Sequence, residues 1–292
     1  MLTDLFFTLR PKTLIIAFAV IFLGQLLAYF DLSRANITTF DFTIVAACLS
    51  CCLCLQIAVN LANDYFDFKA HVDGPNRLGP KRALQSNLIS PSQLKKIIFG
   101  FCLFAIFSGG YLVYRGGWIF ALLGILSLLG VYAYSGGKKS IASTGLGEVA
   151  VFFYFGWIAV IGSYYLQTGS FFWNLFIPAS EIGCLIAAVM LVNNIRDITG
   201  DFAAGKVTLA CRLGPSNSRW LYAVLLLLPF ILLPFNPYLP WLNSVLLPLH
   251  LSLSWLIRKR TGRELNTQLG QTSLLVLLWA LGYFFSFILS PF

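Results

Sequence analysis

Long apolar runs separated by polar stretches dominate the pattern of this 292-residue chain. A helix rises about 1.5 Å per residue, so about 20 apolar residues cross the hydrocarbon core of a bilayer. Nine runs approach this length, at residues 14–30, 42–61, 97–114, 117–134, 146–166, 171–192, 220–235, 239–257 and 272–289. The pattern predicts an all-α polytopic membrane protein with about nine transmembrane helices, forming a single domain over residues 1–292.

The seventh and eighth runs differ from the others because they contain or border five prolines, Pro229, Pro234, Pro237, Pro240 and Pro248. Proline removes a backbone donor and disturbs a helix, although bilayer helices tolerate it where neighbouring groups satisfy the freed backbone. We expect these prolines to kink the two helices or to shift their ends.

Composition and charge agree with a membrane protein. Hydrophobic residues make up 58% of the chain and charged residues 11%, against about 25% charged residues in a typical soluble domain. If nine spans alternate in direction, 18 of the 20 Lys and Arg residues fall on one side, and only Arg34 and Arg115 fall on the other. The positive-inside rule then places the N-terminus in the cytoplasm and the C-terminus outside. The net charge of +9 therefore reports topology, and we expect no nucleic-acid partner.

The seven cysteines lie mostly within apolar runs, and only Cys51, Cys52 and Cys54 cluster. They lack the histidine spacing of a zinc site and the framework of a disulfide-rich secreted domain. We expect reduced thiols that pack as small buried side chains.

Two polar motifs end the second and sixth predicted helices. The first is NLANDYFD at 60–67, and the second is NNIRDITGD at 193–201. Residues at i, i+4 and i+7 or i+8 share one helix face. That spacing relates Asn60, Asp64 and Asp67 in the first motif, and Asn193, Asp197 and Asp201 in the second; Asn63 and Asn194 are further polar residues of the two motifs. Each helix therefore presents two carboxylates at its end.

The two acidic motifs are expected to meet at one membrane face. Their helices are four positions apart in the order of spans, so both run toward the cytoplasm and end at the same depth. Converging carboxylates repel one another and need a cation, and Mg²⁺ prefers oxygen ligands and bridges carboxylates to phosphates. The alternative is that the acids only pair with nearby basic residues, namely Lys69, Arg77, Lys81, Arg82 and Arg196.

Six segments carry a family resemblance: RPKTL at 10–14, NLANDYFD at 60–67, GPNRLGPKR at 74–82, YSGGKKSIASTGLGE at 134–148, NNIRDITGD at 193–201 and AGKVTLACRLG at 204–214. Together they resemble the UbiA-type intramembrane prenyltransferases. Within that superfamily the chain is most similar to the branch that prenylates 1,4-dihydroxy-2-naphthoate in menaquinone synthesis. Many relatives space the first two acids as Asp-x-x-x-Asp, whereas Asp64 and Asp67 are three apart. This leaves open which of Asp64, Asp67 and Asp73 ligates metal directly.

The resemblance implies a role for each polar group. Asp64, Asp67, Asp197 and Asp201 are the implied catalytic Mg²⁺ ligands, and Asn60, Asn63, Asn193 and Asn194 orient ligands or diphosphate oxygens. Phosphate contacts are expected from Arg82, Lys138, Lys139 and Lys206, and Arg10 and Lys12 are candidates to hold the acceptor carboxylate. Aromatic faces stabilise cations, which suggests Tyr65 and Tyr134 for the allylic cation. Glu148 is assigned an acceptor-side or a structural role, and Glu181 is assigned none.

The implied reaction transfers a polyprenyl group from an allylic polyprenyl diphosphate to 1,4-dihydroxy-2-naphthoate, with loss of CO₂ and diphosphate. The expected setting is the lipid of a bacterial inner membrane, with the active site toward the cytoplasm. Two alternatives stay open. One is a prenyltransferase of the same superfamily that uses 4-hydroxybenzoate or homogentisate, and the other is a secondary carrier for an anionic metabolite.

Overall fold

The computed structural model describes residues 8–70, 78–79, 82–86, 88–137 and 140–289, and the regular structure in these ranges is helical. Its principal elements are α2 (Pro11–Arg34), α3 (Phe42–Lys69), α4 (Pro91–Gly116), α5 (Trp118–Ala133), α6 (Gly147–Val151), α7 (Gly162–Thr168), α8 (Phe176–Ala203), α9 (Leu209–Leu232), α10 (Leu247–Lys259) and α11 (Leu265–Leu289). A π-helical segment, η2 (Phe152–Ile161), joins α6 to α7 into one continuous helix.

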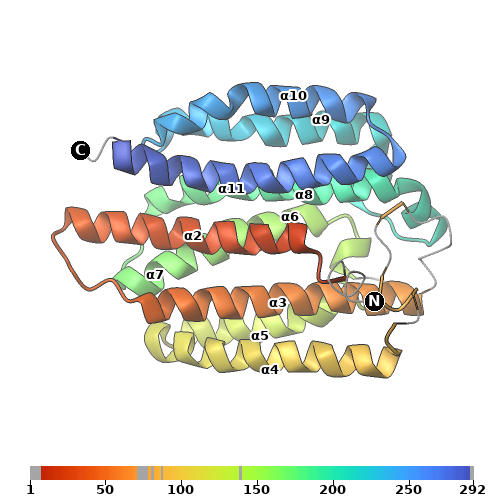
Figure 1. Cartoon of the computed structure of the whole chain (residues 1–292), viewed down its shortest axis with the longest axis horizontal. Helices are drawn as coiled ribbons and strands as arrows, with labels where there is room; N and C mark the ends of the chain where they lie inside the picture. The colour runs from red at the N-terminus through yellow and green to blue at the C-terminus, as the bar shows by residue number, and fades with distance from the viewer. Residues whose placement is uncertain (1–7, 71–77, 80–81, 87, 138–139, 290–292) are drawn as a thin grey trace.

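The helices run side by side along the longest dimension of the molecule (Figure 1). The buried helix α8 packs against η2, α9 and α11, while α2 packs against α3, α7 and α11. Helices α4 and α5 form the periphery next to α3. The start of α2 and the ends of α3 and α8 lie at one end of the bundle, and α11 ends at the other (Figure 1). Both acidic motifs are thereby brought to one end.

All nine predicted apolar runs contain helical structure. Seven helical segments in the described part of the chain are long and apolar enough to cross a membrane: Pro11–Arg34, Phe42–Lys69, Pro91–Gly116, Gly147–Thr168, Trp173–Ala203, Leu209–Phe235 and Gly262–Leu289. The other two runs correspond to α5, with 16 residues, and to α10, with 13 residues after the 3₁₀ turn η5 (Trp241–Leu246). The all-helical membrane fold is therefore confirmed, whereas the count of nine spans stays a prediction.

Local sequence explains where several helices begin. The side chain of Asp41 accepts a hydrogen bond from Thr43 N at the start of α3, and Ser90 and Gln93 form a reciprocal capping box at the start of α4. Such caps satisfy backbone donors that a helix leaves free in its first turn. Pro234 lies in the 3₁₀ turn that follows α9, and Pro248 lies in the first turn of α10. These two prolines therefore shift helix ends, as the sequence predicts.

Glu181, to which the sequence alone assigns no role, is completely buried between α8, α11 and the segment after α9. Its carboxylate accepts hydrogen bonds from Asn236 Nδ2 at 2.8 Å, Tyr283 Oη at 2.5 Å and Trp279 Nε1 at 3.2 Å. A buried carboxyl group is tolerated when its oxygens are hydrogen-bonded in this way. Glu181 therefore joins three parts of the bundle and has a structural role.

Candidate functional site

A large cavity of about 1410 Å³ opens between α2, α3, α4, α5, η2, α7 and α8. Small-molecule pockets usually measure about 300 to 1,000 Å³, so this one has room for more than one small substrate. Asp64, Asp67, Asp197 and Asp201 all line it. The acidic end is polar, and most of the remaining wall is apolar.

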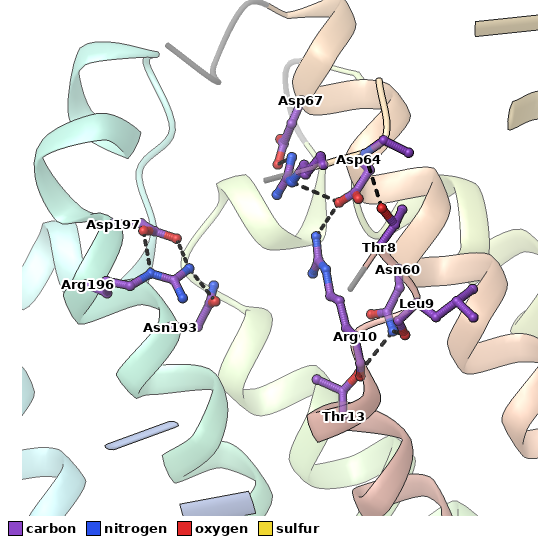
Figure 2. A network of polar contacts seen from close by, with 12 residues as sticks. Thr8, Leu9, Arg10, Thr13, Asn60, Asp64, Asp67, Asn193, Arg196 and Asp197 are labelled. Carbon is purple, nitrogen blue, oxygen red and sulfur yellow. Dashed lines mark hydrogen bonds and ion pairs between the residues drawn. The ribbon is translucent and has the colours of Figure 1, made fainter. Parts of the chain in front are cut away.

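The first acidic motif is buried in the last turns of α3 and is surrounded by cations. Asp64 Oδ1 lies 2.5 Å from Arg10 Nη2 and 2.9 Å from Arg82 Nε. Asp67 Oδ2 lies 2.8 Å from Arg82 Nη1, and Asp67 Oδ1 pairs with Lys206 Nζ. Three cations thus face two carboxylates. The surplus positive charge favours an anionic ligand at this wall of the cavity. Figure 2 shows Arg10 reaching Asp64 from the segment before α2.

Arg82 is 7% exposed and bridges both carboxylates of the first motif. Burial alone favours the neutral guanidine, but the charges of Asp64 and Asp67 outweigh it and raise the pKa of Arg82 above its ordinary value. The loop that carries Arg82 is therefore tied to the end of α3 by a permanent cation.

Arg10 reaches Asp64 from an unusual backbone position just before α2. Its φ of 54° and ψ of 64° lie in the left-handed region, which few residues other than glycine adopt. Pro11 follows, and proline disfavours right-handed helical geometry in the residue before it. Asn60 fixes this segment, because its Nδ2 donates to Leu9 O at 3.2 Å and to Thr13 Oγ1 at 3.0 Å. A strained residue that is held in place by its surroundings is typical of functional sites.

The second acidic motif faces the first from α8, and its central cation is Arg196 (Figure 2). Arg196 Nε and Nη2 donate to the two oxygens of Asp197 at 2.8 and 2.5 Å, and Nη2 also donates to Asn193 Oδ1 at 2.8 Å. Its remaining Nη1 donates to Asn266 Oδ1 at 2.8 Å. Asp201 is 8% exposed and also lines the cavity.

The four carboxylates stand as two pairs: Arg10, Arg82 and Lys206 contact the first pair, and Arg196 contacts Asp197 of the second. In the described ranges there is no cluster of three or more His, Cys, Asp or Glu side chains close enough to hold one metal ion. The pairing with Arg82 and Arg196 that the sequence left as an alternative is thus present, yet both pairs line one cavity. Mg²⁺ is usually held by one or two carboxylates together with substrate phosphates, so this arrangement fits the ion when a diphosphate is bound.

Two buried acceptor atoms support that fit. Asn63 Oδ1 and Asp64 Oδ2 have no hydrogen-bond partner among the residues that the structure describes, and both residues line the cavity. An unsatisfied buried polar group costs about 1 to 3 kcal/mol. Oxygen atoms left without a donor at the wall of a cavity are suited to ligate a hard cation.

Of the two tyrosines that the sequence suggested, only Tyr134 lines the cavity. Its hydroxyl donates to Met190 Sδ at 3.4 Å. Tyr65 is not among the cavity residues, and its ring instead packs with the small cluster around Leu61 and Leu94. Successive residues on a helix point about 100° apart, which turns Tyr65 away from the face that carries Asp64. A direct contact between Tyr65 and a bound substrate is therefore not supported by its position.

The other predicted residues are distributed as follows. Lys12 and Asn194 line the cavity; Lys12 Nζ donates to Asn266 O at 2.9 Å, and Asn194 Nδ2 donates to Glu148 Oε1 at 2.8 Å. Glu148 is 4% exposed and orients Asn194 from behind the cavity wall. Lys138, Lys139 and Asp73 lie outside the described residues.

Asn266 is a site residue that sequence reasoning missed. It lies at the start of α11, where its side chain accepts from Arg196 and donates from Nδ2 to Leu78 O at 2.9 Å. Its backbone carbonyl accepts from Lys12. The only signal in the sequence is a polar residue just before the last apolar run, which is common at helix starts and did not distinguish it.

These features define a class of protein: a membrane-embedded helical bundle with one cavity suited to an amphiphilic anion, polar and charged at one end and apolar beyond it. The chain belongs to the UbiA prenyltransferase family, whose sequence profile matches residues 21–281. The resemblance found in the six sequence segments is thereby confirmed.

Similar proteins include the 1,4-dihydroxy-2-naphthoate octaprenyltransferases of Haemophilus influenzae and Mycobacterium tuberculosis. The first is 38% identical over 225 residues, which span 75% of this chain and 72% of the relative. The second is 37% identical over 239 residues, which span 80% of this chain and 81% of the relative. Both alignments cover most of the two chains compared.

Solved structures agree with the fold. A UbiA homolog from Archaeoglobus fulgidus, bound to DMAPP and Mg²⁺, superposes with a TM-score of 0.66 at 14% identity and covers 94% of this chain and 96% of that one. The apo UbiA homolog from Aeropyrum pernix K1 gives a TM-score of 0.69 at 13% identity and covers 96% of this chain and 98% of that one. At these identities the likeness concerns the arrangement of helices.

Proposed function

We propose that this chain, as a single intramembrane domain, transfers a polyprenyl group from an allylic polyprenyl diphosphate to 1,4-dihydroxy-2-naphthoate and releases CO₂ and diphosphate. The observation that carries the proposal is the cavity, in which two carboxylate pairs and the cations beside them stand at one end of a long apolar space. A diphosphate with a hydrocarbon tail has this same division of polarity. Relatives that are 31 to 38% identical carry the corresponding enzyme name.

The diphosphate end of the substrate is assigned to the acidic motifs. Asp64 and Asp67 on one wall, and Asp197 and Asp201 on the other, would hold Mg²⁺. Bound Mg²⁺ supplies positive charge that neutralises a leaving diphosphate. Arg10, Arg82 and Lys206 add fixed cations beside the first pair. Preorganised charges of this kind favour the separation of a leaving anion, because they need no reorientation during the reaction.

Cleavage of the allylic C–O bond leaves a cation on the prenyl group. Tyr134, Tyr154 and Phe155 line the cavity, and an aromatic face stabilises a nearby cation by about 0.5 to 2 kcal/mol. The apolar wall excludes water, which would otherwise capture the cation. The naphthoate ring then attacks through the carbon that bears the carboxylate. The C–CO₂ bond breaks, and its electron pair restores the aromatic ring of the prenylated quinol.

The acceptor is tested by supplying membranes that contain the protein with a polyprenyl diphosphate and one aromatic compound at a time. We expect a prenylated product with 1,4-dihydroxy-2-naphthoate. Product from only 4-hydroxybenzoate or homogentisate would assign the chain to another acceptor. Absence of product with all three, together with uptake of an anion into vesicles, would favour a carrier. Mass spectrometry of extracted lipids gives the measurement.

We further propose nine spans in a bacterial inner membrane, with the N-terminus and the active site toward the cytoplasm. The 18 to 2 distribution of Lys and Arg supports this orientation. In Figure 1, α5 and α10 lie alongside the longer helices, which supports a crossing by each of them. At about 1.5 Å per residue, these two helices measure about 24 and 20 Å, so their flanking segments complete the crossing.

The proposed topology predicts the location of two reporter fusions. A reporter fused after Phe292 is expected to be external, and one inserted within residues 74–82 is expected to be cytoplasmic. Paired alkaline phosphatase and green fluorescent protein fusions measure this, because each is active on only one side. If both positions were on the same side, the number of spans would be even, and α5 or α10 would not cross.

A further inference from the structure

The cavity continues far beyond the charged end. Along α3 its wall extends from Asp64 back to Cys48, a separation of about 24 Å at 1.5 Å per residue. Along α5 it extends from Tyr134 back to Phe120, a separation of about 21 Å on the same scale. The wall of this deep part, which we call the tail chamber, is formed mainly by apolar and small side chains from α3, α4, α5 and α7.

Glycines keep the tail chamber wide. Gly110 on α4 and Gly124 on α5 line it, and a methyl group added at either position would meet no other atom within 4 Å. Glycine weakens the interior of a helix relative to alanine, and no neighbouring atom at these two positions would clash with a larger side chain. A larger side chain at Gly124 would therefore project into open space, about 15 Å along α5 from Tyr134.

Phe120 stands at the far end of the tail chamber and is held there by its neighbours. Its ring stacks on the ring of Tyr165 with centroids 5.9 Å apart and an angle of 23°. A methyl group on Gly116 would lie 2.1 Å from the Phe120 ring, and one on Gly162 would lie 3.7 Å from it. The ring thus fills the space between the end of α4 and the start of α7. It forms the wall at that end of the tail chamber.

We propose that Phe120 sets the length of prenyl tail that the bundle encloses, and that Gly124 keeps the path to it open. This inference rests on the proposed function, because it assigns the tail chamber to the hydrocarbon of the allylic diphosphate. The reacting carbon lies at the charged end, so each added isoprene unit extends the tail toward Phe120. A tail that reaches the ring has no further room within the bundle.

The test compares three variants in competition assays with allylic diphosphates of two to eight isoprene units and 1,4-dihydroxy-2-naphthoate. Gly124→Leu is expected to lower the ratio of kcat/KM for the longest over the shortest diphosphate at least tenfold. Phe120→Ala is expected to raise the same ratio at least threefold. Gly100→Leu is the matched control, because Gly100 on α4 lies outside the cavity lining and its added side chain also meets open space. It should leave the ratio unchanged.

A second measurement tests binding of the tail in the absence of the transfer reaction. Thermal stabilisation of the purified protein by each diphosphate, with Mg²⁺ and without acceptor, should show the same dependence on length in the same variants. Unchanged ratios in both Gly124→Leu and Phe120→Ala would overturn the inference and would mean that the tail leaves sideways into the bilayer. If the wild type prenylates none of the acceptors, the proposed function fails, while the stabilisation profile still tests the tail chamber.

Discussion

Asp64→Asn is expected to reduce the rate of prenyl transfer at least about 100-fold, a loss comparable to the removal of one preorganised electrostatic contact in other enzymes. The substitution keeps the shape of the side chain but removes the charge that meets Arg10 and Arg82. The same change removes a carboxylate that would ligate the metal. Asp197→Asn is expected to reduce the rate of prenyl transfer at least about tenfold, because it also removes a carboxylate that would ligate the metal. Initial rates of product formation, with the melting temperature of each purified variant, measure both effects.

Asp41→Asn is the matched control for these substitutions. Asp41 caps the opposite end of α3, and asparagine caps a helix about as well as aspartate. The substitution also removes the ion pair with Arg115, but that pair is partly exposed, and such pairs contribute little to stability. We expect the rate to stay within about twofold of the wild type. Wild-type rates in both Asp64→Asn and Asp197→Asn would refute the assignment of the acidic motifs.

Excess EDTA is expected to abolish turnover, with a loss of at least about 100-fold, because carboxylates and diphosphate repel each other without a bridging cation. Since each carboxylate pair has only two acids, metal binding depends on the oxygens of the substrate. Release of diphosphate should stop in EDTA and return when Mg²⁺ exceeds the chelator. EDTA already saturated with Mg²⁺ serves as the control and should have no effect. Full turnover in excess metal-free EDTA would contradict a metal requirement.

Local patterns in the sequence predicted the helices and the positions of the acids along them. Asp64 and Asp67 lie on the cavity face of α3, and Asp197 lies on that of α8, because the helical repeat alone fixes which residues share a face. The same reasoning explains why Tyr65 lies outside the cavity lining. Its closeness to Asp64 in sequence suggested a shared site, whereas one step along a helix turns a side chain by about 100°.

Contacts between distant segments were beyond the reach of sequence patterns. Lys206 pairs with Asp67 across 139 positions, and Asn266 approaches Leu78 across 188. Such pairs depend on how helices pack, which no local periodicity specifies. The tail chamber also depends on helix packing. In the sequence, Gly110 and Gly124 look like any glycine of a bilayer helix, and only the placement of the neighbouring helices leaves open space beside them.

We expect the acceptor to be attacked at the carbon that bears its carboxylate, and a label in that carboxyl group follows the carbon through the reaction. The protein is supplied with a polyprenyl diphosphate and 1,4-dihydroxy-2-naphthoate labelled in the carboxyl carbon. We expect labelled CO₂ and diphosphate to be released in equal amounts, and we expect the prenylated product to carry no label. Label retained in the prenylated product would rule out attack at that carbon, since attack at any other carbon restores aromaticity by losing a proton and keeps the carboxylate.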